Sequence, residues 1–315
     1  MTQKNSFIKF DKDGNKTHDY KSLADSITTL PTLRSNIVDL VQSIENTYQT
    51  DLPIFVNNVR KDQSLVAQIL KVARASKYAR LIQVDTISDA IQVLGVERLR
   101  NIALTQSFLG NFLKPNPYKH GFDWKAFWKH ANAVGIISSI IAKRMGKSDH
   151  ERFYTAGLLH DMGKMGAFCL DENKMLKVSS TARAQSRSFI QTEKELGTPR
   201  HDLLGEAIGE SWDLPEYLIM VCRYHHTYFR GQRMPDQFCS EKREQLNEYI
   251  DVVILANCLA KKLKQGYSGH SCIEEPESMI LKNLTLQESM LEEITPTIIA
   301  ELNEGSFLDD LFEAA

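Results

Sequence analysis

The chain has 315 residues, 42% hydrophobic and 25% charged, a composition typical of a globular protein with one or two domains. The formal net charge is −2 and the isoelectric point is about 6.5, so the chain has no overall excess of basic residues that would favour a phosphate backbone. The composition therefore argues against nucleic acid as a partner.

The cysteines and the first residues indicate a cytoplasmic protein. The five cysteines are scattered, and none forms a C-x-x-C pair, which favours reduced thiols over a disulfide framework or a zinc ribbon. The first residues contain no apolar stretch of the signal-peptide type. The longest apolar runs are too short to span a bilayer, so we expect no membrane association.

The beginning of the chain is predicted to form a short hairpin followed by helices. Polar and apolar residues alternate over residues 6–10, and Asp13-Gly14 supplies a turn. Farther on, apolar residues recur every three or four positions, which is the spacing of one helix face. This periodicity predicts helices over residues 64–75, 90–94 and 96–112. The segment Thr86-Ile87-Ser88-Asp89 offers N-caps for the second of these helices, and Gly95 can end it.

A segment rich in proline, asparagine and glycine, residues 114–121, marks the expected boundary between two lobes. We expect an N-terminal extension over 1–22, a first lobe over 23–115 and a second over 122–310. Periodicity predicts helices in the second lobe over residues 123–145, 149–170, 188–196, 201–212, 216–224, 241–264 and 286–301. No strand pattern follows residue 20, so the sequence predicts an all-α protein with two helical lobes and a short hairpin.

The segment with the clearest chemical meaning is GLLHDMGK, residues 157–164. His160 and Asp161 are neighbours on a predicted helix, where adjacent side chains diverge by about 100°. At a helix end they can still converge on one ion, and the two oxygens of Asp161 could bridge two ions. Lys164 lies three residues after Asp161, on the same side, where it could hold a phosphate oxygen.

Three other segments could complete a metal pocket around this pair. His130 lies inside an apolar helix, His201 opens the segment HDLLG, and His225-His226 follow another apolar helix. Imidazole and carboxylate ligands suit zinc, iron, manganese or nickel better than calcium, which prefers oxygen.

Each of these residues also has an ordinary explanation when it is taken alone. His130 could be a core residue, His225-His226 a pair favoured by a helix dipole, His201 a surface residue and Lys164 a solvated charge. The metal hypothesis therefore depends on the joint arrangement. The remaining histidines have no partners in the pattern and are expected at the surface: His18, His120, His150 and His270.

In order and spacing these segments resemble the HD superfamily, and HDOD domains in particular. The resemblance covers roughly residues 25–265 and rests on several segments: 61–70, 86–104, FWKHANAVG (127–135), AGLLHDMGK (156–164), 196–215 and RYHH (223–226). In related HD phosphohydrolases, histidines and aspartates hold one or two metal ions, and a metal-bound water attacks phosphorus. HD-GYP enzymes, the catalytic cousins, hydrolyse a cyclic dinucleotide.

The resemblance also implies a role for each residue. Asp161 would bridge, and Lys164 would touch phosphate. The other implied ligands are His201, His225 and His226 for one metal, and His130 and His160 for the second.

The chain departs from the enzyme pattern at two places. Where the family has a last aspartate ligand, this chain has Asn257, whose neutral amide holds a cation less firmly; Asp251 is an alternative donor that is out of register. The Gly-Tyr-Pro signature is replaced by Arg233-Met234-Pro235. HDOD domains generally resemble regulatory modules without established catalysis.

We therefore expect a signalling module with a partly complete metal pocket, which holds one or two divalent ions (Fe, Mn, Zn or Ni) and has a nucleotide as a candidate ligand. The alternative is a metal-dependent phosphohydrolase that acts on a nucleotide or cyclic dinucleotide. A third hypothesis is a structural scaffold without a metal. The signalling partner is not indicated by the sequence.

Overall fold

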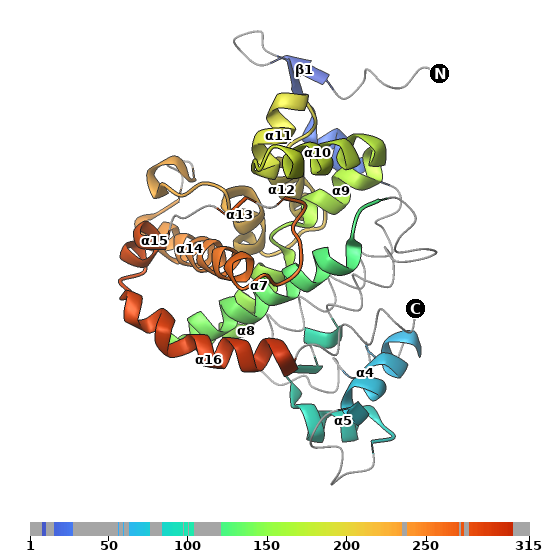
Figure 1. Cartoon of the computed structure of the whole chain (residues 1–315), viewed down its shortest axis with the longest axis vertical. Coiled ribbons are helices and arrows are strands. Elements are labelled where there is room, and N and C mark those ends of the chain that lie inside the picture. Colours follow the sequence, from blue (N-terminus) through green and yellow to red (C-terminus); the bar gives the residue numbers. More distant parts are fainter. Residues whose placement is uncertain are drawn as a thin grey trace.

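A computed structural model gives the architecture of the chain. It describes residues 8–10, 16–27, 56, 59, 63–75, 84–96, 98–99, 101–103, 121–234, 238–270, 272–273 and 277–304. Nearly all regular elements in these ranges are helices, which confirms the all-α prediction (Figure 1). Strands β1 (Ile8–Phe10) and β2 (Lys16–His18) form the predicted antiparallel hairpin. Its expected turn at Asp13-Gly14 lies outside the described residues, as does nearly all of the expected boundary segment.

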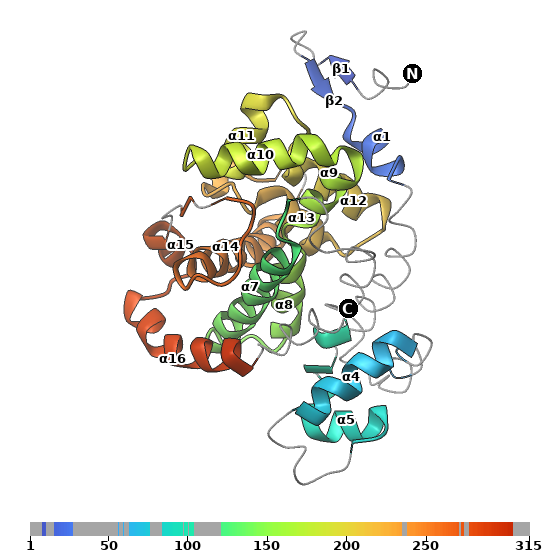
Figure 2. The same cartoon turned by 45° about the vertical axis from the view of Figure 1, so that its right-hand side comes forward.

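The described part of the first lobe includes a pair of packed helices, α4 (Gln63–Ala75) and α5 (Ile87–Leu94). They lie at the end of the molecule opposite the hairpin (Figures 1 and 2). Thr86 and Asp89 form a capping box at the start of α5, since each side chain accepts a hydrogen bond from the other's backbone N–H. Gly95 ends this helix with a φ of 80°. The end of α5 agrees with the expectation, whereas its first residue, Ile87, lies three residues before the expected start at residue 90.

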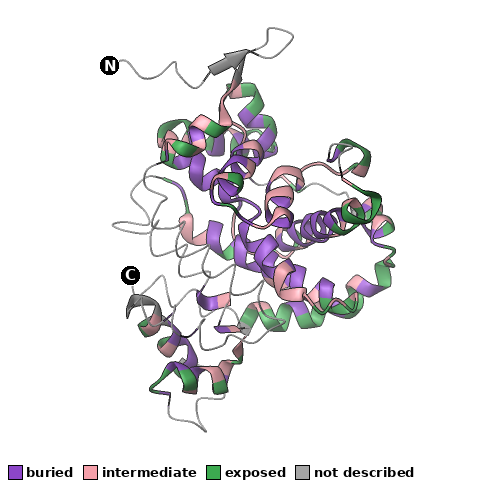
Figure 3. Cartoon of the chain, turned by 180° about the vertical axis from the view of Figure 1, so that it is seen from behind, coloured by how far each residue is buried: buried purple, intermediate pink, exposed green. Residues whose placement is uncertain are grey.

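Two long helices, α7 (Trp124–Arg144) and α14 (Ser240–Lys262), form the buried centre of the second lobe (Figure 3). Helix α8 (His150–Leu159) packs along α7. The remaining helices of this lobe are α9 (Met162–Leu170), α10 (Glu172–Ala184), α11 (Phe189–Leu196), α12 (His201–Ser211), α13 (Glu216–Tyr224), α15 (Glu277–Asn283) and α16 (Glu288–Glu304). A short 3-10 turn, η2 (Arg230–Gln232), precedes α14. None of the described helices is both long and apolar enough to cross a membrane.

The second lobe differs from the prediction in one helix break and two additional helices. The single helix expected over residues 149–170 is two helices, because Asp161 leaves the helical backbone with φ −101° and ψ 14°. Neither glycine nor proline occupies the break, so the sequence carries no ordinary signal for it. Helices α10 and α15 were not predicted. Polar residues dominate α10, and its buried apolar side chains are few.

Glycines let the ligand-bearing helices touch through their backbones. A Cβ on Gly157 of α8 would lie 2.8 Å from Cα of Gly135 on α7. A Cβ on Gly163 of α9 would lie only 1.9 Å from the carbonyl oxygen of His201 on α12. Only glycine permits such close approach, which lets α8 pack closely on α7 and α9 pack closely on α12.

The segment before the first lobe packs on the second lobe. Helix α1 (Tyr20–Asp25) lies against α12, and the Tyr20 hydroxyl accepts a hydrogen bond from the backbone N–H of Arg200 at 3.2 Å. The residue next to this contact is His201, so α1 supports the start of a ligand-bearing helix.

Candidate metal centre

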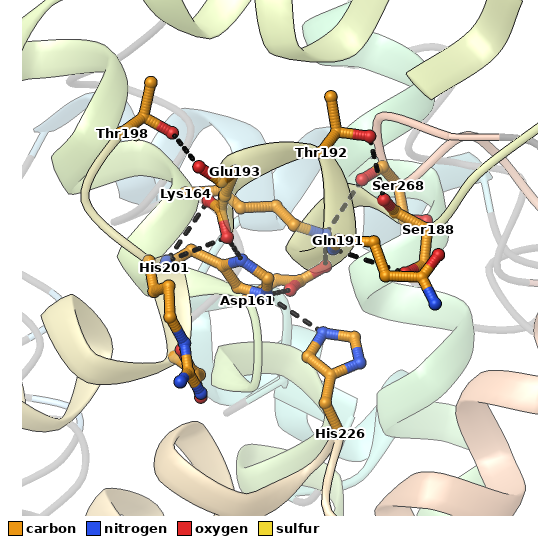
Figure 4. Close-up of polar contacts among 12 residues, drawn as sticks. Asp161, Lys164, Ser188, Gln191, Thr192, Glu193, Thr198, His201, His226 and Ser268 are labelled. Atoms are coloured by element: carbon orange, nitrogen blue, oxygen red, sulfur yellow. Dashed lines mark hydrogen bonds and ion pairs between the residues drawn. The ribbon is translucent and has the colours of Figure 1, made fainter. Parts of the chain in front are cut away.

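The seven residues expected to form the pocket meet in the interior of the second lobe. They come from α7, the α8–α9 junction, the beginning of α12 and the end of α13: His130, His160, Asp161, Lys164, His201, His225 and His226. The exposed fraction is 2% or less for all of them except His226, which is partly exposed. Figure 4 shows Asp161, Lys164, His201 and His226 turned toward one another.

Asp161 is the centre of this arrangement. Its Oδ1 lies 3.4 Å from Nε2 of both His201 and His225, and its Oδ2 lies 3.3 Å from Nε2 of His160. The Nε2 atoms of His201 and His226 are 3.0 Å apart. The donor atoms fall into two sets that share Asp161, each with all atoms within 4.8 Å of one another. One set is Asp161, His201, His225 and His226, and the other is His130, His160 and Asp161.

Hydrogen bonds on the far side of the rings fix the donors toward the pocket. Nδ1 of His160 lies 2.7 Å from the carbonyl oxygen of Gly157, and Nδ1 of His225 lies 3.0 Å from that of Cys222. A carbonyl oxygen only accepts, so the proton is on Nδ1 and the Nε2 lone pair faces Asp161.

Several buried atoms of the pocket lack hydrogen-bond partners among the described residues: Nε2 of His130, His160 and His225, and Oδ1 of Asp161. Nitrogen lone pairs directed at a carboxylate repel it unless a proton or a cation lies between them. The donor set thus fits a transition metal ion, for which imidazole and carboxylate are the usual ligands.

The electrostatics of the pocket also favour the metal-binding protonation state. Burial lowers the pKa of four imidazoles: His130, His160, His201 and His226. Burial alone would raise the pKa of Asp161, but the ammonium of Lys164 holds it well below its usual range. Neutral imidazoles around an ionised carboxylate are what metal coordination requires.

Lys164 is buried, and its ammonium contacts other groups of the protein. Its ammonium donates to Oδ2 of Asp161 at 2.7 Å and to the carbonyl oxygen of Ser268 at 2.9 Å, and it lies over the ring of Phe189 (Figure 4). Lys164 therefore orients the shared carboxylate in this structure. Its expected contact with a phosphate stays a prediction.

Glu193 is a supporting residue that the sequence analysis missed. Its buried carboxylate lies 2.7 Å from Nδ1 of His201 and accepts a hydrogen bond from the backbone N–H of the same residue (Figure 4). A carboxylate behind a metal-ligating histidine orients the ring and increases its basicity. Glu193 precedes His201 by eight residues across the turn at Gly197, a spacing that matches no local motif.

The two uncertain donors have different places. Asn257 is buried on α14, and its Oδ1 has no hydrogen-bond partner in the described chain. Asp251 is an unsuitable metal ligand, because its carboxylate pairs with Nε of Arg230 at 2.6 Å and with Nη2 of Arg233 at 2.7 Å. Asp251 belongs to neither of the two donor sets. Arg233, which replaces part of the Gly-Tyr-Pro signature, thus fixes the segment after His226 to α14.

The histidines expected at the surface also differ from one another. His18 and His150 are partly exposed, and His120 lies outside the described residues. The prediction for His270 was wrong, because its exposed fraction is 4%. Nε2 of His270 lies 3.1 Å from Nζ of Lys261, at the end of α14, and this contact pulls the ring inward.

Comparison with known proteins identifies the family and the fold of the chain. The family model of the HDOD domain matches residues 30–228, which is more than half of the chain. The chain belongs to the HDOD family. An uncharacterized protein of Treponema pallidum (strain Nichols) is 24% identical over 206 residues, which are 65% of this chain. The match spans only 39% of that longer relative.

Solved structures share the HDOD fold. An HDOD domain protein of unknown function from Geobacter sulfurreducens superimposes with a TM-score of 0.69 at 21% identity, covering 93% of this chain and 98% of the other. A protein from Marinobacter aquaeolei VT8, provisionally named a signal transduction protein, gives 0.64 at 19% identity, covering 87% and 57%. One from Shewanella amazonensis SB2B, provisionally named a phosphohydrolase, gives 0.60 at 20%, covering 90% and 97%. At these identities the likeness establishes the fold alone.

Proposed function

We propose that this HDOD protein is a regulatory signalling module whose second lobe binds a divalent transition metal ion at Asp161, His201, His225 and His226. The observation that carries the proposal is the convergence of buried imidazole nitrogens on one carboxylate, with several of these atoms unpartnered. When bound, the ion supplies a positive charge that offsets Asp161 and removes its repulsion with the nitrogen lone pairs.

Two features favour regulation over turnover. The position of the family's last aspartate carries the neutral Asn257, and Asp251 cannot replace it while two arginines hold its carboxylate. The segment over residues 265–270 also lies across the pocket. The backbone N–H of Tyr267 donates to Ala126 on α7 at 2.8 Å, and Ser268 accepts from Lys164. A substrate would have to displace these contacts to reach the metal ligands.

The alternative is a metal-dependent phosphohydrolase that acts on a nucleotide or a cyclic dinucleotide. It is favoured by the second donor set, His130, His160 and Asp161, since two ions that share a carboxylate can stabilise both the attacking and the leaving oxygen of a phosphoryl group. The provisional name of the Shewanella relative points the same way.

Elemental analysis of the full chain purified without chelator tests the metal centre. We expect bound transition metal in the wild type, its loss in Asp161→Asn, and its retention in the control His150→Ala, which removes a partly exposed histidine outside the pocket. A wild type without metal would overturn both hypotheses.

Turnover by the metal-replete protein then separates the two functions. Assays with nucleotides and cyclic dinucleotides should show no sustained hydrolysis. Multiple turnovers that disappear in His160→Ala would establish the phosphohydrolase and refute the regulatory assignment.

A further inference from the structure

The end of α14 and the segment after it hold a polar pair outside the candidate metal ligands, formed by the half-buried Lys261 and the buried His270. Nζ of Lys261 lies 3.1 Å from Nε2 of His270. An ammonium group can only donate, so Nε2 accepts and the imidazole proton is on Nδ1. This Nδ1–H is buried and has no hydrogen-bond partner in the described chain. One N–H donor of the pair, on His270, therefore lacks an acceptor among the described residues.

The positive charge of Lys261 also has no direct counter-charge. Among the described residues no carboxylate lies within ion-pair distance of its ammonium, and the ring of His270 beside it is neutral. Asn257, one turn earlier on α14, is a neutral amide. Burial, and next the charge of Lys164, lower the pKa of Lys261 to about 8, so the ammonium is charged at neutral pH. A charged group packed in this way is costly unless an anion accompanies it.

This pair lies at the wall of the metal pocket. A Cβ on Gly266 would be 2.4 Å from the backbone nitrogen of His130, so the segment leading to His270 lies directly on a pocket residue. Two residues before His270, the carbonyl oxygen of Ser268 accepts from Lys164. The hydroxyl of Ser268 is buried and has no partner in the described chain.

The balance of buried charges points to the missing partner. Two ammonium groups, Lys164 and Lys261, lie near the ionised Asp161, whereas burial raises the pKa of Glu193 well above its usual range, so these side chains carry no excess negative charge. A divalent ion then adds two positive charges that no described side chain of the pocket offsets. An anionic ligand would restore neutrality.

We propose that Lys261 and His270 form an oxyanion-binding site beside the metal centre, in which Lys261 contacts the anion and His270 holds the ammonium in place. The chemical class is a ligand with a phosphoryl or carboxylate group. This inference rests on the proposed function, because the anion would be the ligand that the regulatory pocket senses. His270 offers its Nδ1–H, on the far side of the ring, to a second polar atom of the same ligand.

Calorimetric titration of the metal-loaded full chain with inorganic phosphate, and separately with acetate, tests the site. Loss of a charge-assisted hydrogen bond in Lys261→Met should weaken binding about tenfold or more. Lys262→Met, which removes an exposed neighbouring charge on the same helix, should bind like the wild type. His270→Gln keeps an oxygen that can accept from Lys261 and should bind nearly as well, whereas His270→Leu should resemble Lys261→Met. The stronger of the two anions identifies the group.

Equal binding by Lys261→Met and Lys262→Met, or no binding of either anion to the wild type at millimolar concentration, would overturn the inference. Metal content distinguishes this failure from failure of the proposed function, because Lys261→Met should keep its ion. If a variant does not fold, a labelling experiment on the wild type alone still tests the site. Phosphate should protect Lys261 from acylation, as followed by peptide mass spectrometry, and unchanged labelling would contradict the proposal.

Discussion

Replacing Asp251 by asparagine should destabilise the protein through the arginines that its carboxylate holds. The side chains of Asp251 and Arg233 are both 0% exposed, and their pair distance is 2.7 Å. Arg230 adds a second bond of 2.6 Å to the same carboxylate. The substitution leaves a buried guanidinium without its counter-charge, and breaking a buried pair in this way costs about 3–5 kcal/mol.

Urea unfolding of the metal-free protein, followed by circular dichroism, measures this loss. Glu244→Gln is the matched control, because Glu244 also pairs with Arg230 but its side chain is 67% exposed, and such pairs contribute about 0–1 kcal/mol. Replacing both buried partners, with Asp251→Leu and Arg233→Met, should recover much of the stability. If Asp251→Asn cost no more than Glu244→Gln, the assignment of a buried ion pair would be refuted.

Three further outcomes are expected. Gly163→Ala should lower the free energy of unfolding by about 1–3 kcal/mol or more and should also lower the metal content, because its Cβ would lie 1.9 Å from the His201 carbonyl oxygen. Gly231→Ala, with open space around it, should change neither quantity in unfolding experiments and elemental analysis. Removing the metal with a chelator should lower the melting temperature, since a free ion concentration about 1,000-fold above Kd stabilises the fold by roughly 4 kcal/mol; an unchanged melting temperature would contradict metal binding. Because the pKa of Lys261 is lowered in the folded state to about 8, its contribution to stability is complete above the unfolded value of 10.5 and is lost as pH falls through 8. The free energy of unfolding of the metal-free protein should therefore rise above pH 8. Lys261→Met should lack this rise, and the difference between the two proteins assigns it to Lys261. The other titratable groups near the position are unchanged in this variant: Lys164, Asp161, Cys258, Cys272 and His270.

Helices with local end signals could be predicted closely from the sequence. In α5 the cap at Thr86 lies within the four positions expected to cap the helix, and the end at Gly95 follows from a positive φ; both features depend on near neighbours. The break at Asp161 could not be predicted in this way. It arises where α9 approaches α12 at Gly163, a tertiary contact that overrides the local helical preference.

The candidate site was predictable to the extent that its residues form a recognisable order along the chain. His160, Asp161 and their partner histidines carry that pattern, and the structure brings them together. Glu193 and the Lys261–His270 pair carry no such pattern. Their roles depend on which carbonyl, ring or ammonium lies opposite in the folded chain, and such pairings have no fixed sequence spacing.

The backbone contacts at Gly157 and Gly163 would limit the radius of an ion bound at the proposed metal site. Where main chains already touch, a change of rotamer cannot adjust the spacing of α7 to α8 or of α9 to α12. Zinc binds imidazole and carboxylate donors at about 2.0–2.2 Å, whereas calcium needs six to eight oxygens at about 2.3–2.6 Å. A cage of this rigidity discriminates by ionic size as well as by donor type, so a large excess of calcium should leave its occupancy by the smaller ion unchanged.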